Sequence, residues 1–446
     1  MGESIARAVE ACQKGNLEGL ESALEEGVSP TAHDDDKCTL LHWAAINNRV
    51  PIVKRLLELG ADPNAVGGLL VSSPLHWACR VGHVFSSALL VKAGAVCNVR
   101  DAQGYTPIHL AVQCNQSILV AYLLEKFHYC KDITDNSGMT PVMWAAYRTF
   151  GMFPIRIIVQ SGADLNAQEH LSGNTALHIA IQEHNNMSIR ELLRGNADVS
   201  LRNKQQETPL DIARNMRDQR VLWKTTKRAK HLAGFFLPGF VFSLIALAFF
   251  QLHYVVAVFI LLAITLLLRY FVRFDAHTTT SSLIPLGICI AEPIAMIITW
   301  FAYVHWFVSW WMQIAFFVIM FVLFGSLIKI VLSDPGVIKP RTDSHEEFVE
   351  AIERCESVNY CFTCWVDKAQ SAKHCSVCDR CVMQFDHHCP WLHQCITDRN
   401  LYMFLVFIAS VALSSAIYSC AAVLYIINEL YRLSLTTNMR ERSNAE

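Results

Sequence analysis

Residues 361–395 read CFTCWVDKAQSAKHCSVCDRCVMQFDHHCPWLHQC. This stretch contains seven of the sixteen cysteines in the chain, together with four histidines. Structural zinc sites take four Cys or His ligands, usually supplied as closely spaced pairs. Cys361 and Cys364 form one such pair, and Cys375 and Cys378 form a second. The spacing therefore predicts a zinc-binding module rather than a disulfide framework, which fits a reducing, cytosolic environment.

The same stretch offers more ligands than two zinc ions need. With His393 left aside, two closed sites need eight ligands and the candidates number ten, namely Cys361, Cys364, His374, Cys375, Cys378, Cys381, His387, His388, Cys389 and Cys395. Side chains two residues apart in an extended segment share a face. We therefore expect His387 and Cys389 on one face, and His388 on the other, toward a zinc. A thiol beside an imidazole makes a nucleophile, and Asp386 can hold that imidazole in the required tautomer.

The first half of the chain repeats a short motif of the form Thr-Pro-Leu-His-x-Ala. It recurs at steps of 33 to 35 residues, beginning at Thr39, Ser73, Thr106, Thr140, Thr175 and Thr208. Both the period and the motif resemble ankyrin repeats, which bury their apolar faces only by stacking on one another. We expect about seven repeats in residues 1–220, the first of them degenerate. The repeated histidines are expected to bond within the turns and not to bind metal.

Apolar runs long enough to cross a bilayer of ~30 Å follow the repeats. After a basic linker at residues 221–231, four such runs are Leu232–Gln251, Tyr254–Val272, Leu283–Val304 and Trp306–Leu332. A fifth occupies residues 401–428, before a polar tail at 429–446. Lys and Arg favour the cytoplasmic ends of spans, so their positions predict that the repeats and the Cys-rich domain, residues 333–400, both face the cytosol. Glu292 lies inside the third run, where it is either functional or neutralised by a neighbour.

Together these features predict a mainly α-helical protein. An ankyrin solenoid precedes a multi-span membrane domain, and a cytosolic zinc domain is inserted before the last span. A formal net charge of −2 gives no indication of nucleic-acid binding.

The Cys-rich stretch resembles the Asp-His-His-Cys protein S-acyltransferases, or palmitoyltransferases. The resemblance rests on Asp386-His387-His388-Cys389, on the cysteine spacing and on Asp334-Pro335-Gly336. The order of domains resembles their ankyrin-bearing subfamily, the huntingtin-interacting protein 14 type. The resemblance implies that Cys389 is the nucleophile, His387 the base and Asp386 its orienting acid.

The resemblance also implies two structural zinc ions and a set of partners. One zinc would take Cys361, Cys364, His374 and Cys381, and the other Cys375, Cys378, His388 and Cys395. Palmitoyl-CoA or another long-chain acyl-CoA would acylate Cys389, which passes the acyl group to cysteines of substrate proteins at a Golgi or other endomembrane. Asn47 and Trp77 correspond to residues that capture substrate peptides. Packing between repeats is the alternative role for these two residues.

The chain departs from the family pattern at two places. Leu392-His393-Gln394-Cys395-Ile396-Thr397 lacks the glycine that follows the last zinc ligand, so we expect strain there, and His393 adds a competing ligand. The family's two final spans and Thr-Thr-x-Glu motif are replaced by one span and Thr436-Thr437-Asn438-Met439. These departures favour an alternative function, a catalytically weak membrane scaffold that binds partners through its ankyrin repeats. An ankyrin-bearing channel is disfavoured, because a zinc module stands where a pore loop belongs.

Overall fold

The computed structural model describes residues 2–147, 153–216 and 284–443. The chain forms two compact units. The first comprises Met1–Thr226 and Pro340–Asp367, and the second comprises Lys227–Lys339 and Lys368–Glu446. The predicted Cys-rich domain, residues 333–400, is therefore not one unit, because its early part packs with the repeats. The predicted linker, residues 221–231, lies outside the described residues.

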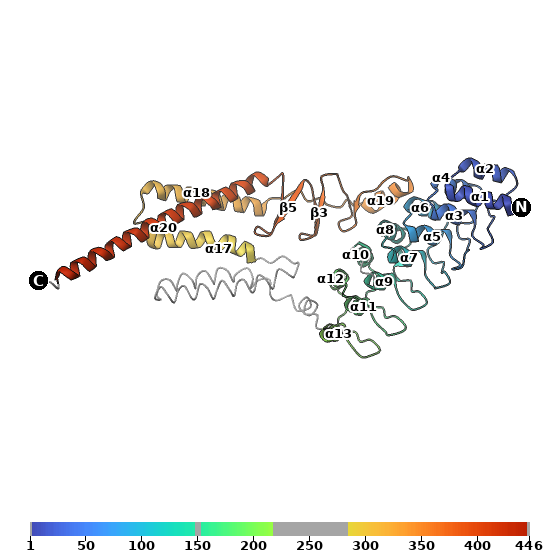
Figure 1. Cartoon of the computed structure of the whole chain (residues 1–446), viewed down its shortest axis with the longest axis horizontal. Helices are drawn as coiled ribbons and strands as arrows, with labels where there is room; N and C mark the ends of the chain where they lie inside the picture. Colours follow the sequence, from blue (N-terminus) through green and yellow to red (C-terminus); the bar gives the residue numbers. More distant parts are fainter. Residues whose placement is uncertain (1, 148–152, 217–283, 444–446) are drawn as a thin grey trace. The chain divides into compact units, whose positions relative to one another are not determined.

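The first unit is a solenoid of short helices stacked in pairs, with the connecting loops on one side (Figure 1). Its helices are α1 (Gly2–Lys14), α2 (Leu17–Glu25), α3 (Leu40–Ile46), α4 (Val50–Glu58), α5 (Pro74–Val81), α6 (Val84–Lys92), α7 (Pro107–Gln113), α8 (Ser117–Lys126), α9 (Pro141–Tyr147), α10 (Phe153–Gln160), α11 (Ala176–Gln182), α12 (Asn186–Arg194) and α13 (Pro209–Asn215), with a 3-10 turn at His128–Asp132. The ankyrin architecture expected from the repeat period is confirmed.

The repeated histidines hold each repeat to the next. In the second repeat, the Thr39 N–H donates to Nδ1 of His42 (3.0 Å), which makes Nδ1 the acceptor. The Nε2–H of the same ring then donates to the carbonyl of Ser72 in the following repeat (2.8 Å). His76, His109 and His178 make the same pair of bonds. The prediction that these histidines are structural is confirmed, and their geometry requires the neutral imidazole.

The first unit also contains a segment from the second half of the chain. Helix α19 (Ser344–Glu353) and the hairpin of β1 (Tyr360–Cys361) with β2 (Val366–Asp367) belong to it. Phe348 and Ile352 of α19 are fully buried in the same apolar core as the ankyrin helices. This burial explains why the segment packs with the repeats, because α19 has an apolar face to cover.

The second unit contains apolar helices and two small hairpins. The helices are α17 (Ile284–Thr299), α18 (Trp310–Leu332) and α20 (Leu401–Ser443), with a π-helical turn at Trp300–Val304. α18 and α20 pack together. The hairpins pair β3 (Lys373–Cys375) with β4 (Arg380–Val382), and β5 (Phe385–Cys389) with β6 (Gln394–Thr397).

Two helices of the described part of the chain are long and apolar enough to cross a membrane, Trp310–Leu332 and Leu401–Arg432. A shorter apolar helix covers Cys289–Thr299, within the third predicted run. The first two predicted runs lie outside the described residues, so five spans stays a prediction. Helix α20 continues past residue 428 to Ser443, and the predicted end of the last span at residue 428 stays a prediction. No Gly or Pro interrupts residues 429–443, so nothing there ends the helix.

The histidine bonds predict that the repeats loosen in acid. Burial lowers the pKa of His109 to about 4, whereas the unfolded chain titrates near pH 6.5. Protonation therefore favours the unfolded state. The stabilisation is complete above about pH 6.5 and is lost as the pH falls toward 4, by up to about 3 kcal/mol at this residue.

Hydrogen–deuterium exchange of the full chain, corrected for the intrinsic rate, measures this effect as faster opening of α7 at pH 5 than at pH 7.5. Helix α9 is an internal control, because Met143 occupies the histidine position there. Equal changes in α7 and α9 would contradict the titration of His109 as the cause.

Candidate active site and metal centres

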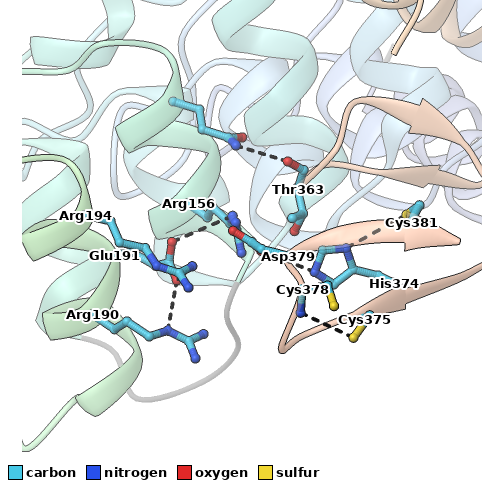
Figure 2. Close-up of polar contacts among 11 residues, drawn as sticks. Arg156, Arg190, Glu191, Arg194, Thr363, His374, Cys375, Cys378, Asp379 and Cys381 are labelled. Carbon is cyan, nitrogen blue, oxygen red and sulfur yellow. Dashed lines mark hydrogen bonds and ion pairs between the residues drawn. The ribbon is translucent and has the colours of Figure 1, made fainter. Parts of the chain in front are cut away.

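One group of four metal-binding side chains lies wholly in the second unit. Cys375, Cys378, His388 and Cys395 offer one donor atom each, and these atoms all lie within 4.8 Å of one another. Sγ of Cys378 is 3.4 Å from Sγ of Cys395 and 3.3 Å from Nδ1 of His388. The Cys378 N–H also donates to Sγ of Cys375 (3.4 Å), which closes the knuckle at the turn between β3 and β4 (Figure 2). Three thiols and one imidazole at this separation fit a closed zinc site.

The other predicted ligand set is divided between the two units, with Cys361 and Cys364 in the first and His374 and Cys381 in the second. His374 and Cys381 are opposite one another in the β3–β4 ladder, and Nδ1 lies 3.9 Å from Sγ (Figure 2). Nε2 of the same imidazole lies 3.5 Å from a carboxylate oxygen of Asp379, which orients the ring. The group within the second unit is one of the two sets of residues that the family resemblance implies.

The motif Asp386-His387-His388-Cys389 lies on β5, and neighbouring side chains turn to different surroundings. His388 approaches the sulfurs of Cys378 and Cys395. Cys389 belongs to neither metal-binding group and is buried in an apolar cluster with residues of α18 and α20. A register irregularity between Phe385 and His387 marks the start of this alternation. Adjacent residues of β5 therefore meet different surroundings, with His388 beside metal-binding sulfurs and Cys389 in an apolar cluster.

The imidazole of His387 lies next to an acid and an aromatic ring. Its Nδ1 is 3.1 Å from Oδ2 of Asp386, and its ring meets the ring of Phe404 edge-on with centroids 5.4 Å apart. Both His387 and Asp386 keep much of their side-chain surface exposed, at 43% and 61%. The carboxylate can thus fix the tautomer with the proton on Nδ1, which leaves Nε2 as the base.

Cys389 opens into a cavity of about 400 Å³ between α17, α18 and α20. Most of the lining is apolar and includes Met296, Leu323, Leu392, Phe404, Phe407 and Val411. The lining residues of α20 extend from Phe404 to Ser415, which at the rise of a helix is about 16 Å. Glu292, for which the sequence leaves the role open, also lines this cavity. The nucleophile candidate is thus at one side of a pocket shaped for an apolar group.

Buried polar residues after Cys389 anchor the β5–β6 hairpin to the apolar helices, and the sequence pattern does not predict these anchors. The Gln394 amide, which is 7% exposed, donates to the carbonyl of Ser333 just past α18 (3.0 Å). The Thr397 hydroxyl donates to the carbonyl of Pro335 (2.9 Å). The Asn400 amide donates to the carbonyl of Cys395 (3.0 Å). The sequence offers one signal for these anchors, which is that all three polar residues lie close to the predicted metal ligand Cys395.

The strain expected at Thr397 is not found. Thr397 ends β6 in extended backbone, and its hydroxyl is satisfied. The left-handed conformation falls on His393, whose φ is 51° at the hairpin turn. His393 is in neither metal-binding group, so the structure does not place it as a competing ligand. Its ring lies 5.7 Å from that of His388, between centroids.

Asp334-Pro335-Gly336 ties the end of α18 to the strands. Oδ1 of Asp334 accepts the backbone N–H groups of Gly336 and Val337, both at 3.0 Å. These hydrogen bonds hold the pKa of Asp334 below its usual value. The carbonyl of Gly336 accepts the N–H of Met383 just past β4 (3.0 Å). Gly336 has φ 91°, a conformation that suits glycine.

The two predicted peptide contacts differ in their surroundings. Trp77 lines a groove of about 340 Å³ on the ankyrin unit, together with Trp43, Asp36 and Arg80. The rings of Trp77 and Trp43 meet edge-on with centroids 5.6 Å apart. Asn47 is not among the lining residues of this groove, and its amide donates to the carbonyl of Trp43 (2.8 Å). Asn47 therefore supports the end of α3, the helix that carries Trp43, whereas the indole of Trp43 donates to Oδ2 of Asp34 (2.8 Å).

Comparison with known proteins decides the family. A sequence profile of the DHHC palmitoyltransferases matches residues 354–444, and ankyrin-repeat profiles match residues 8–101, 75–169 and 172–204. Palmitoyltransferase Hip14 of Drosophila melanogaster is 33% identical over 440 residues, which is 90% of this chain and 68% of that protein. The chain belongs to the DHHC palmitoyltransferases. The family expected from the motifs is thus confirmed.

Other relatives support the same membership. Palmitoyltransferase ZDHHC17 of Homo sapiens is 32% identical over 92% of this chain and 70% of its own length. Putative palmitoyltransferase ZDHHC13 of Danio rerio is 30% identical over 90% of this chain and 66% of its own length. Among solved structures, the ankyrin repeat domain of Bcl-3 is similar at a TM-score of 0.43 and 28% identity, over 48% of this chain and 97% of that domain.

The two donor groups of this DHHC palmitoyltransferase predict about two zinc ions per chain. Substitution of Cys375 by serine should lower the measured content by about one ion, because a closed site tolerates the loss of a thiolate ligand poorly. Cys355→Ser is the matched control, since that exposed cysteine belongs to neither group. Metal analysis of purified protein measures the content, and an equal loss in both variants would contradict the assignment.

Proposed function

We propose that Cys389 of this DHHC palmitoyltransferase carries the acyl group during transfer. The thiolate attacks the thioester carbonyl of a long-chain acyl-CoA, a new carbon–sulfur bond forms, and the CoA thiolate leaves and takes up a proton. The thiol of a substrate protein then attacks the new thioester, and Cys389 leaves as the thiolate. Each step exchanges one thioester for another, so the reaction needs no oxidant or further energy source.

The observation that carries this proposal is the position of Cys389. It lies outside both metal-binding groups and lines the apolar cavity. A zinc-bound thiolate at this position would be held away from the acyl donor. Each methylene of a fatty chain that enters the cavity contributes about 0.8 kcal/mol of burial, so long chains are favoured over short ones.

We assign the proton transfers to His387. Its Nδ1 faces the Asp386 carboxylate at 3.1 Å, which leaves Nε2 to take the thiol proton and to return it to the leaving group. The carboxylate stabilises the imidazolium that forms, as the third member of a triad does. The exposure of both side chains lets a CoA thioester and later a substrate cysteine approach from the aqueous side.

Zinc would supply structure and not chemistry here. The cysteines and histidines of the two groups would hold one ion each, and closed four-ligand sites leave no position for a substrate. Within the second unit, the ligands His388 and Cys395 lie opposite one another in the β5–β6 ladder. Fixing this pair fixes the strand that carries His387 and Cys389.

The ankyrin repeats would recruit the proteins to be acylated. The groove beside Trp77 combines indole surfaces with one acidic and one basic side chain, Asp36 and Arg80. Aromatic side chains at the centre of such a surface commonly contribute most of the binding energy. We propose that Trp77 contacts the peptide and that Asn47 supports the helix that carries Trp43.

We further propose that the protein resides in a Golgi or other endomembrane, with the ankyrin repeats and the Cys-rich domain facing the cytosol. The apolar helices α18 and α20 support membrane residence. A cytosolic location fits the cysteines of the described residues, none of which forms a disulfide. Substrate cysteines and acyl-CoA are then on the same side as Cys389.

A catalytically weak scaffold is the second candidate. It is favoured by one observation, the replacement of the family's final acidic motif residue by Met439 in Thr436-Thr437-Asn438-Met439. The scaffold would use the same ankyrin groove to bind partners. It differs from the enzyme only in the absence of an acyl-enzyme, so direct labelling separates the two.

Cys389→Ser should abolish acyl labelling, because the serine hydroxyl cannot form a thioester. Purified protein is incubated with a clickable palmitoyl-CoA, and the label is tested for release by hydroxylamine. Cys355→Ser, a change at an exposed cysteine outside both donor groups, should keep the label. Label that persists in Cys389→Ser would remove this residue as the nucleophile, and no label in the parent protein would favour the scaffold.

Alanine at both Asn47 and Trp77 should lower acyl transfer to a recruited substrate protein by 10-fold or more, about 1.4 kcal/mol, while the acyl-enzyme still forms at the parent rate. Trp144→Ala is the control for loss of an indole, because Trp144 lies in another repeat and outside the groove. The two activities are measured side by side, as label on the enzyme and label on the substrate. An equal fall in both would indicate a folding defect instead of lost recruitment.

A further inference from the structure

The segment that leads into the zinc module packs on the ankyrin repeats, although at least 120 residues of sequence separate it from them. Helix α19 contacts α6 and α8. Phe348 and Ile352 are fully buried in the ankyrin core, and Phe362 of the following hairpin joins them. The ring of Phe348 meets those of Phe362 and Trp365 edge-on, at centroid distances of 5.5 and 5.8 Å. The cysteine knuckle Cys361–Cys364 lies between these two aromatic residues in sequence.

A half-buried charge cluster fixes the end of α19. The Glu353 carboxylate lies 2.5 Å from Nζ of Lys126 and 4.0 Å from Nζ of Lys92. The Tyr122 hydroxyl, on α8 with Lys126, donates to the same carboxylate at 3.5 Å. Only 17% of the Glu353 side chain is exposed. Removing one member of such a cluster leaves a partly buried charge without compensation, which is more costly than loss of a surface ion pair.

Two further contacts extend to the knuckle itself. Nδ1 of His345 lies 2.7 Å from a carboxylate oxygen of Glu125 on α8, and its ring stacks on Trp365 at 3.9 Å. The Gln160 amide, at the end of α10, donates to the carbonyl of Thr363 (3.2 Å) (Figure 2). Thr363 stands between Cys361 and Cys364. The repeats therefore hold the backbone of a metal-binding knuckle directly.

The segment has little capacity to fold by itself. An isolated helix as short as α19, at 10 residues, is marginal in water. Strands β1 and β2 have two residues each, and a single hairpin is unstable without a surface to pack on. Its order must therefore come from the ankyrin helices that it covers.

We propose that the ankyrin repeats are the folding platform of the first zinc knuckle. The outer face of α6, α8 and α10 binds residues 344–365 of its own chain, and this contact holds Cys361 and Cys364 in place for the metal. The repeats thus have a structural task in the zinc module besides recruitment, and this face is not available to substrate proteins. The inference rests on zinc binding by Cys361 and Cys364, not on acyl transfer.

A charge exchange tests the platform. Lys126→Glu and Glu353→Lys should each lower the zinc content from about two ions to about one, because the knuckle loses its support. Each should also make residues 340–367 sensitive to limited proteolysis. The double exchange restores an opposite pair and should recover most of the zinc and of the protease resistance. All variants are made in full-length Cys389→Ser protein without acyl-CoA, so failure of the transfer mechanism does not affect the result.

A matched control uses a pair on the same helix that does not touch the repeats. Glu350 and Arg354 form an exposed ion pair along α19, and their exchange should change neither readout. Single variants that keep the parent zinc content and cleavage pattern would overturn the proposal. A double exchange that recovers nothing would also overturn it, since the effect would then not depend on the pairing of Lys126 with Glu353.

Discussion

Alternation of side chains along β5 places two kinds of chemistry on adjacent residues. His388 faces sulfurs of a metal-binding group, and Cys389 faces an apolar cavity among the membrane helices. The peptide backbone fixes this division, because successive side chains of a strand point to opposite faces. In the proposed mechanism the same division keeps the reactive thiol away from zinc.

Three buried polar side chains, on β6 and just after it, hold the β5–β6 hairpin in place against the apolar helices. Gln394 bonds to the end of α18, Thr397 bonds to the turn that follows it, and Asn400 closes the start of α20 onto β6. Each amide or hydroxyl is buried, so each would be costly if unsatisfied. Together with the buried side chains of Leu392 and Ile396, the anchors explain how the hairpin keeps a fixed position at the mouth of the cavity.

The ankyrin unit depends on one hydrogen-bond pattern that recurs from repeat to repeat. A neutral histidine in each of four repeats accepts a bond from its own turn and donates one to the next repeat. The stacked surface that results has an outer face, and α19 covers part of it. The proposed recruitment at the groove beside Trp77 and the proposed support of the Cys361–Cys364 knuckle would use different faces of one solenoid.

The sequence by itself determined the family, the repeat architecture and the presence of paired metal ligands. These properties follow from local spacing: ligand pairs two or three residues apart, a period near 33, and the parity of His387, His388 and Cys389 on one strand. Tertiary structure alone decided that α19 packs on α6 and α8, that Thr397 is an unstrained buried anchor, and that Glu292 lines the cavity. Those contacts join residues distant in sequence, and their energy comes from burial and from hydrogen-bond partners that no local pattern specifies.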